Sequence, residues 1–372
     1  MDFHLDKVED IGGFTVTNVP KDHYFWMLVK ASLTSDELEF YKYIEQLSSF
    51  FLNKVRVSSN MVNQFLVLIH KELNADVFVN DIRVSIEILA KRDLKKMEAV
   101  SKRDIADIRR LRLNDIRILK TDKLIYCFKV GWKFALFFDL SRELNTEEIE
   151  LTLGRLYRHL AFQHVFQVLE SSILFEEMVK DGWFPFIELI GGDYEEISKA
   201  YENKFDFENN IERVVSHFDG DRIKKITDRW WGKDVFQQKR LIIEAGISSF
   251  LDGNSTGYIN CINTLLPQVE GIIRIQYFTG TGKGRKVRLP ELLRYLIEKG
   301  KTKGGCDDSL LLPLPFFEYL KDVVYCDFDL ESGKLDLSRH SSSHGVARPE
   351  DYTKFKALQT ILLLDQIYFY ID

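Results

Sequence analysis

The chain has 372 residues, of which 45% are hydrophobic and 29% charged, and its formal net charge is −6. This length exceeds that of a usual single-core domain, so we expect two domains, and the apolar content excludes a disordered chain. The negative net charge argues against a protein that coats nucleic acid.

The N-terminus and the cysteines bear on the compartment of the protein. The first residues lack the basic flank and apolar stretch of a secretory signal, and no run approaches the roughly 20 apolar residues that cross a bilayer. We therefore expect a cytoplasmic protein with no membrane partner. Because the cysteines form no Cys-x-x-Cys pair, we expect free thiols, no metal and no cofactor. These cysteines are Cys127, Cys261, Cys306 and Cys326.

The first 145 residues mix one helix with several apolar runs typical of strands. Thr34 and Glu37 stand at capping-box spacing and predict a helix that begins near Thr34, with an apolar face that continues to Phe51. Two apolar runs joined through Gly131-Trp132 predict a hairpin. The predicted strands are Gln64–Ile69, Asp76–Asn80, Val84–Leu89, Leu124–Val130 and Lys133–Asp139.

From Thr146 onward helical periodicity dominates, so we place a domain boundary near residue 145. The predicted fold class is α+β, with an N-terminal mixed module at 1–145 and a larger helical region at 146–372. The predicted helices are Glu147–Val179, Tyr194–Asn203, Asn209–His217, Val235–Asp252, Gly257–Phe278, Pro290–Lys299, Leu314–Val324 and Asp351–Ile371.

Two segments carry more basic than acidic residues, although the net charge of the chain is negative. Lys91–Lys120 carries eleven basic and five acidic side chains, and Lys283–Lys303 carries eight basic and two acidic ones. Such patches attract phosphate backbones, although a charge run is more often a solvated face. The adjoining Thr279–Gly284 resembles a phosphate-binding loop, but Gly284 stands where Ser or Thr is required. We expect a flexible basic connector instead.

The strongest candidate for chemistry is the segment Arg339-His340-Ser341-Ser342-Ser343-His344-Gly345, shortly before a predicted amphipathic terminal helix. An arginine beside a histidine suits RNA cleavage in which the chain's own 2′-hydroxyl attacks the adjacent phosphate. Histidine moves a proton near neutral pH, and guanidinium stabilises charge on the pentavalent phosphorane, so no metal is needed. The alternative is a polar loop whose side chains cap the terminal helix.

The motif Arg339-x-x-x-x-His344 next to a C-terminal helix resembles the HEPN superfamily of nucleotide-binding and ribonuclease domains. Together with Tyr258–Gly271, the wider sequence is similar to a microbial lineage of HEPN-like proteins. In that family a polar residue, usually Asn, follows the arginine. His340 fills this place here, so the proton donor is either His340 or His344.

The resemblance implies a helical bundle over roughly residues 235–372 that forms a homodimer, so that two copies of the motif face one shared cleft. Such domains occur in toxins, phage-defence effectors and RNA-processing factors, and some members bind nucleotides or serve as scaffolds. The resemblance says nothing about residues 1–145.

Glu270 lies within the apolar stretch Ile262–Ile275, where an unpaired carboxylate is costly. One interpretation is that it pairs with Arg339 or hydrogen-bonds His344 and thereby orients the site. The other is an exposed glutamate on the far side of its helix.

The sequence thus predicts a metal-independent endoribonuclease, active as a homodimer, in which Arg339 stabilises the phosphate and His344 moves protons with help from His340 and Glu270. The residues expected to hold the RNA backbone are Lys283, Arg285, Lys286 and Arg288. The alternative is a non-catalytic module in which the same Arg and His bind RNA, a nucleotide or a protein phosphate. No DNA-specific motif is present.

Overall fold

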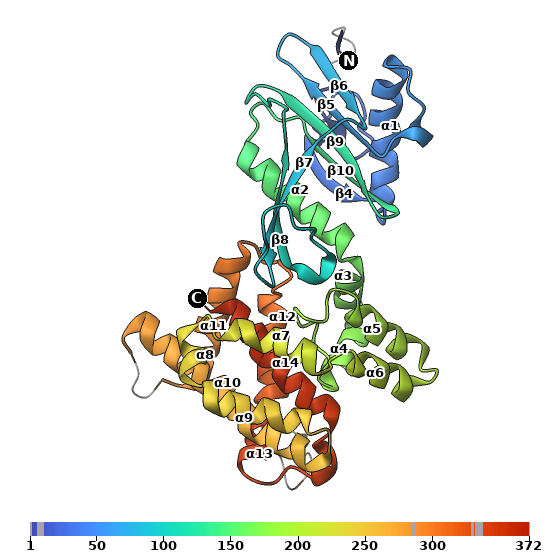
Figure 1. Cartoon of the computed structure of the whole chain (residues 1–372). Coiled ribbons are helices and arrows are strands. Elements are labelled where there is room, and N and C mark those ends of the chain that lie inside the picture. Colours follow the sequence, from blue (N-terminus) through green and yellow to red (C-terminus); the bar gives the residue numbers. More distant parts are fainter. Residues whose placement is uncertain (1, 6–10, 284–286, 329–330, 332–337, 372) are drawn as a thin grey trace. The chain divides into compact units, whose positions relative to one another are not determined.

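A computed structural model of the chain describes residues 2–5, 11–283, 287–328, 331 and 338–371 (Figure 1). Its described strands lie before residue 140 and helices dominate thereafter, which confirms the α+β class. The chain divides into two compact units. The first comprises Met1–Ile88 and Ile108–Gln163, and the second comprises Leu89–Asp107 and His164–Asp372.

The domain boundary expected at residue 145 differs from these units in two ways. Helix α2 (Thr146–Ala161) belongs to the first unit, because its apolar face packs on the sheet. The segment Leu89–Asp107 belongs to the second unit, although it lies early in the sequence. Helical periodicity shows which face of a helix is apolar but not which part of the protein covers that face. The helical pattern therefore begins at residue 146, whereas the first unit ends at Gln163.

A six-stranded antiparallel sheet forms the centre of the first unit, in the order β1-β6-β5-β9-β10-β4. Strands β9 and β10 form the hairpin predicted through Gly131-Trp132, with Lys133 opposite Val130. The strands are β1 (Asp2–His4), β4 (Lys30–Thr34), β5 (Gln64–Ile69), β6 (Asn74–Val79), β9 (Lys123–Val130) and β10 (Lys133–Asp139).

Both faces of this sheet are buried, which explains why its central strands are apolar without alternation. On one face, α1 (Leu38–Lys54) packs Leu47 and Phe51 against alternate strand residues such as Val67. On the other face, Leu153 of α2 packs with the intervening residues, such as Leu66. Successive side chains of a strand point to opposite faces, so a strand covered on both sides is apolar throughout.

The remaining strands form two short ribbons, β2 (Phe14–Thr15) with β3 (Met27–Leu28), and β7 (Val84–Ala90) with β8 (Ile105–Leu113). Helix α2 approaches β8 so closely that a Cβ on Gly154 would lie 2.4 Å from the carbonyl oxygen of Arg109. A glycine at this position therefore permits the contact between helix and strand.

The second unit is helical, and α14 contacts α7, α9, α10 and α11. Over the described residues, no helix combines the length and the apolarity that a membrane span requires. The helices from residue 163 onward are α3 (Gln163–Glu170), α4 (Ser172–Lys180), α5 (Asp193–Asn203), α6 (Phe207–Ser216), α7 (Gly220–Trp230), α8 (Asp234–Gln238), α9 (Arg240–Leu251), α10 (Ser255–Thr281), α11 (Leu289–Gly304), α12 (Pro313–Tyr319), α13 (Arg339–Ser343) and α14 (Lys354–Tyr370).

Several predicted elements need correction. The helix expected near Thr34 begins at Leu38, because Thr34 ends β4 and its amide donates to the Glu37 carboxylate at 2.7 Å. The single helix predicted at Glu147–Val179 is divided into α2, α3 and α4. Helix α7 and strand β8 are missing from the prediction, since many charged residues interrupt their apolar patterns. Helix α14 is buried on nearly every side and is not amphipathic.

A cluster of buried charges joins α14 to α7. Asp365 on α14 accepts hydrogen bonds from Nε and Nη2 of Arg229, at 3.0 and 2.6 Å, and from the indole N–H of Trp230 at 2.8 Å. Arg229 Nη2 also donates to Glu188 at 2.7 Å. Because Asp365 is only 1% exposed, water does not replace these partners, and the packing of the two helices depends on them.

Lys91 attaches the segment Leu89–Asp107 to this cluster. Its buried ammonium group donates to the carbonyl of Ile187, next to Glu188. Burial lowers the pKa of Lys91, while the neighbouring carboxylates act in the opposite direction. Burial acts to raise the pKa of Glu188, but Lys91, Arg229 and Arg222 lower it overall. Lys91 is therefore part of a core ion network and does not belong to a solvated basic face.

Replacement of Asp365 by alanine is expected to destabilise the second unit by about 3–5 kcal/mol, because it removes the acceptor of the buried Trp230 indole and one of the two carboxylates that pair with Arg229. Urea unfolding followed by circular dichroism measures the loss. The matched control is Glu318→Ala, which removes an exposed pair with Lys321 and is expected to cost less than about 1 kcal/mol. Equal effects of the two substitutions would contradict a structural role for the buried cluster.

Candidate functional site

The motif predicted at Arg339 forms the short helix α13, whose start is fixed by two buried serines. Ser338 Oγ accepts a hydrogen bond from the amide of Ser341 at 3.2 Å, and the amide of Ser338 donates to Ser341 Oγ at 2.8 Å. This reciprocal arrangement is a capping box. Ser338 Oγ also donates to the carbonyl of Cys326 at 3.0 Å. The two serines therefore hold the N-terminus of α13 in one position.

The long helix α10 supplies the surface on which α13 packs. Ser342 Oγ donates to Asn263 Oδ1 at 2.7 Å, and the hydroxyl of Tyr352 lies 3.4 Å from the same oxygen. Glu270 follows Asn263 by seven residues, so both side chains lie on one face of α10, two turns apart. These two positions of α10 thus contact α13 directly.

Glu270 pairs with two arginines. Its Oε2 lies 3.2 Å from Arg339 Nη2, which confirms the predicted pairing and excludes an exposed Glu270 on the far side of α10. Its Oε1 accepts hydrogen bonds from Nε of Arg274 at 2.8 Å and lies 2.7 Å from Nη2 of the same arginine. Arg274 is missing from the predicted site, although its position four residues after Glu270 is the spacing of a helical ion pair.

Two buried donors, one within this ion pair and one in its electrostatic surroundings, have no hydrogen-bond partner among the described residues. They are the hydroxyl of Tyr325 and Nε of Arg339. Tyr325 is 6% exposed and interacts electrostatically with Glu270, Arg339 and Arg274. Burial raises the pKa of Tyr325, so its hydroxyl keeps its proton at neutral pH. Since an unpaired buried donor costs about 1–3 kcal/mol, these two atoms are the clearest sign of a functional site in the cluster.

The two histidines lie on other sides of α13. His340 is partly buried, with its ring centre 6.2 Å from that of Tyr325. His344 is exposed at the C-terminal end of the helix, with its ring centre 5.6 Å from that of Phe328. A helix turns by about 100° per residue, so the five steps from Arg339 to His344 separate them by roughly 140° around the axis. One chain therefore brings Arg339 to Glu270 and presents His344 to solvent.

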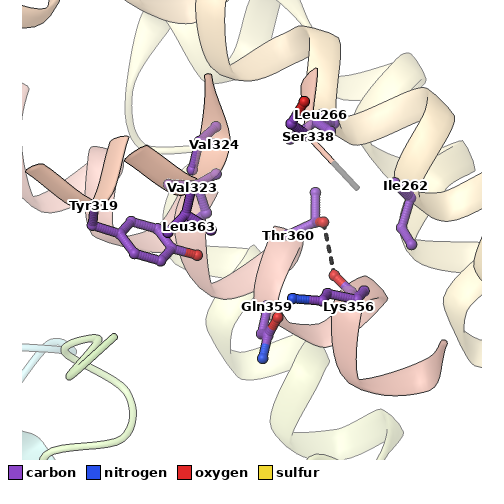
Figure 2. A pocket seen from close by; sticks show the side chains of 10 residues that line it. All are labelled: Ile262, Leu266, Tyr319, Val323, Val324, Ser338, Lys356, Gln359, Thr360 and Leu363. Carbon is purple, nitrogen blue, oxygen red and sulfur yellow. Dashed lines mark hydrogen bonds between the residues drawn. The ribbon is translucent and has the colours of Figure 1, made fainter. Parts of the chain in front are cut away.

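A cavity of about 40 Å³ lies beside Ser338, the residue that caps α13 (Figure 2). Residues of α10, α14 and the π-helical turn Leu320–Val324 line it, and Lys356, Gln359 and Thr360 contribute polar atoms. Figure 2 shows the Thr360 hydroxyl donating to the carbonyl of Lys356. The volume corresponds to about one water molecule, so the cavity does not admit a nucleotide base.

The residues predicted to hold RNA lie in the connector between α10 and α11. Lys283 and Arg288 are exposed near its two ends, whereas Arg285 and Lys286 lie outside the described residues. Arg274 Nη1 donates to the carbonyl of Val287 at 3.0 Å. This bond joins Val287 to Arg274, whose guanidinium group also pairs with Glu270.

Two further histidines of the helical region have local partners. His164 Nε2 lies 2.9 Å from the carbonyl oxygen of Ile190, and His217 Nδ1 lies 3.0 Å from Asp193 Oδ1. Within the described ranges, His, Cys, Asp and Glu side chains do not gather in a group of three that could hold a metal ion.

Comparison of the chain with protein-family models, curated proteins and solved structures gave no match. The candidate site therefore rests on the geometry of the cluster around Glu270.

Replacement of Ser338 by alanine is expected to loosen α13 by about 1 kcal/mol, because it removes the acceptor for the Ser341 amide. Native-state hydrogen exchange measures this loss as roughly fivefold faster exchange of the Ser341 amide at unchanged global stability. The exposed Ser343→Ala serves as the control and should leave the rate unchanged. An unaltered Ser341 amide in the Ser338 variant would refute the capping role.

Proposed function

We propose that the chain is a metal-independent endoribonuclease of the HEPN type, in which Arg339 stabilises the phosphate and His344 moves protons with help from His340. The observation that carries this proposal is the setting of Arg339, a partly buried guanidinium that pairs with Glu270. It is followed by His340 on the same short helix and by His344 at the C-cap of that helix. A HEPN-like bundle over residues 235–372 is part of the same proposal.

The proposed reaction uses the 2′-hydroxyl of RNA as the nucleophile. One histidine takes the proton from the 2′-oxygen, which bonds to the adjacent phosphorus, while the bond from phosphorus to the 5′-oxygen breaks. A second histidine donates a proton to the departing 5′-oxygen. The products are a 2′,3′-cyclic phosphate and a 5′-hydroxyl, and Arg339 stabilises the additional negative charge of the phosphorane.

A homodimer belongs to this proposal, because the side chains of Arg339 and His344 diverge around α13. If a second copy of the chain presents its His344 opposite Arg339, the two motifs form the shared cleft that the HEPN resemblance implies. The exposure of His344 supports this arrangement, since an exposed side chain is accessible to a partner.

A second candidate function is a non-catalytic module in which the same arginine binds a phosphate of RNA, a nucleotide or a protein. The observation that favours it is the pairing of Arg339 with Glu270 in a chain where His344 points elsewhere. Such a module needs Arg339 to bind the phosphate but does not need a histidine that transfers protons, and this difference separates the two functions.

Cleavage of single-stranded RNA in EDTA is expected for the wild-type protein and is expected to fall at least about a hundredfold in both Arg339→Ala and His344→Ala, because each removes one contribution to the transition state. Gel analysis of labelled RNA measures the rate and identifies the 2′,3′-cyclic phosphate.

The controls for this cleavage experiment are Arg348→Ala and His23→Ala, which replace exposed side chains outside the motif. Both should cleave as the wild type does. Activity that persists in the Arg339 and His344 variants would indicate a contaminating nuclease, and no cleavage of any RNA by the wild type would leave the binding module as the function.

Affinity for an uncleavable 2′-O-methyl RNA is expected to fall with salt, and the double variant Lys283→Gln/Arg288→Gln should weaken this dependence. Each lost phosphate contact lowers the slope of log affinity against log salt by about one. Fluorescence anisotropy at several salt concentrations measures the slope. The exposed Lys321→Gln is the control, and an unchanged slope in the double variant would exclude the connector as the RNA-binding segment.

A further inference from the structure

The side chains of Glu270, Arg274, Tyr325 and Arg339, here called the arginine cluster, offer more donors than the carboxylate of Glu270 accepts. Its two oxygens are divided between the two guanidinium groups. Arg339 Nε and the Tyr325 hydroxyl have no acceptor among the described residues, although both are buried. With one carboxylate for two guanidinium groups, the cluster also has one positive charge in excess.

We propose that the arginine cluster binds a single phosphate group, which replaces the carboxylate of Glu270 between Arg274 and Arg339 and accepts a hydrogen bond from Tyr325. This inference rests on the proposed function, since in RNA cleavage the bound group is a phosphodiester of the substrate. It adds Arg274 and Tyr325 to the residues that position this phosphate.

The chemistry of the donors favours phosphate over a carboxylate. Glu270 supplies two oxygens, and both are used by the arginines. A tetrahedral phosphate has further oxygens for the hydroxyl of Tyr325 and for Nε of Arg339, and guanidinium groups bind phosphates through paired hydrogen bonds. Tyr325 stays a donor because its burial disfavours the anion.

The donors of the cluster also bear on the ligand. Guanidinium and hydroxyl groups bind the oxygens of a phosphate, which carry no information about the base. The cavity beside Ser338 is lined by other residues and holds about one water molecule, so the proposed phosphate does not occupy it. The bond from Arg274 to the carbonyl of Val287 places Val287, the residue before Arg288, next to the arginine cluster.

In this proposal the carboxylate of Glu270 competes with the phosphate for the guanidinium groups of Arg274 and Arg339. It neutralises the two arginines in the free protein and must release them when phosphate binds. Removal of its charge by Glu270→Gln is therefore expected to tighten phosphate binding, whereas removal of Arg274 or of the Tyr325 hydroxyl is expected to weaken it. A merely structural ion pair predicts no increase in affinity for the glutamine variant.

Isothermal titration of the full-length protein with inorganic phosphate, at constant ionic strength, tests the inference. Arg274→Gln and Tyr325→Phe are each expected to bind about tenfold more weakly than the wild type, and Glu270→Gln roughly three- to tenfold more tightly. Circular dichroism and thermal unfolding establish that each variant is folded.

Two matched controls are available in the same unit. Arg240 pairs with Glu244 four residues away, at the same 2.7 Å distance as Arg274 with Glu270, so Arg240→Gln removes an equivalent pair elsewhere. Tyr194 also has a buried hydroxyl without a partner among the described residues, so Tyr194→Phe matches Tyr325→Phe. Both controls should bind phosphate as the wild type does.

The outcomes separate this inference from the proposed function. Phosphate binding that responds to the three cluster variants supports the inference even if no RNA is cleaved, in which case only the ribonuclease proposal fails. A wild-type protein that does not bind phosphate, or variants of Arg274 and Tyr325 that bind like their controls, would overturn the inference even if RNA is cleaved.

Discussion

The ion network around Asp365 is the constraint on which the helical unit depends. A carboxylate that is 1% exposed is stable only with its partners in place, and these are Arg229 and Trp230 of α7. Arg229 in turn bonds Glu188, which lies between α4 and α5. Loss of one partner leaves a buried charge, so the network strongly favours one packing of these elements over its alternatives. Lys91 fixes the segment Leu89–Asp107 to the same unit, because its buried ammonium group bonds the carbonyl of Ile187 next to Glu188.

The site depends on α14 and α10 being held in this way. Helix α14 is buried on nearly every side, and its polar residues bond to other segments, such as Gln366 to the amide of Ile187 and the carbonyl of Leu311. Helix α10 packs on α14 and carries Glu270 and Asn263 toward α13. A short helix such as α13 has little stability of its own, so these contacts and its capping serines determine its position.

The arginine cluster has the properties of a polar ligand site and not only of a surface ion pair. The exposed pair of Arg240 with Glu244 joins one cation to one anion. At Glu270 one anion joins two cations, and two further donors are buried beside them. This imbalance is what a phosphate corrects, and it is common to both functions considered for the chain. The two functions differ in whether a histidine moves a proton next to that phosphate.

Local sequence patterns determined the fold class and most of the secondary structure of this protein. The α+β class, the β9–β10 hairpin and most helices follow from periodicities that neighbouring residues carry. The pairing of Glu270 with Arg339 was one of the arrangements that the sequence left open, because a carboxylate within an apolar stretch requires either a partner or exposure to solvent.

Only the tertiary structure decided which parts of the chain belong together. The assignment of α2 to the sheet, the transfer of Leu89–Asp107 to the helical unit and the burial of Lys91 depend on contacts between residues far apart in the sequence. The sequence around Tyr325 did not indicate a role for this residue. Its buried hydroxyl became a candidate only because the structure shows that Tyr325 interacts electrostatically with Glu270, Arg339 and Arg274. Single-sequence patterns report the faces of an element, whereas the partner of each face is determined by the packing of the whole unit.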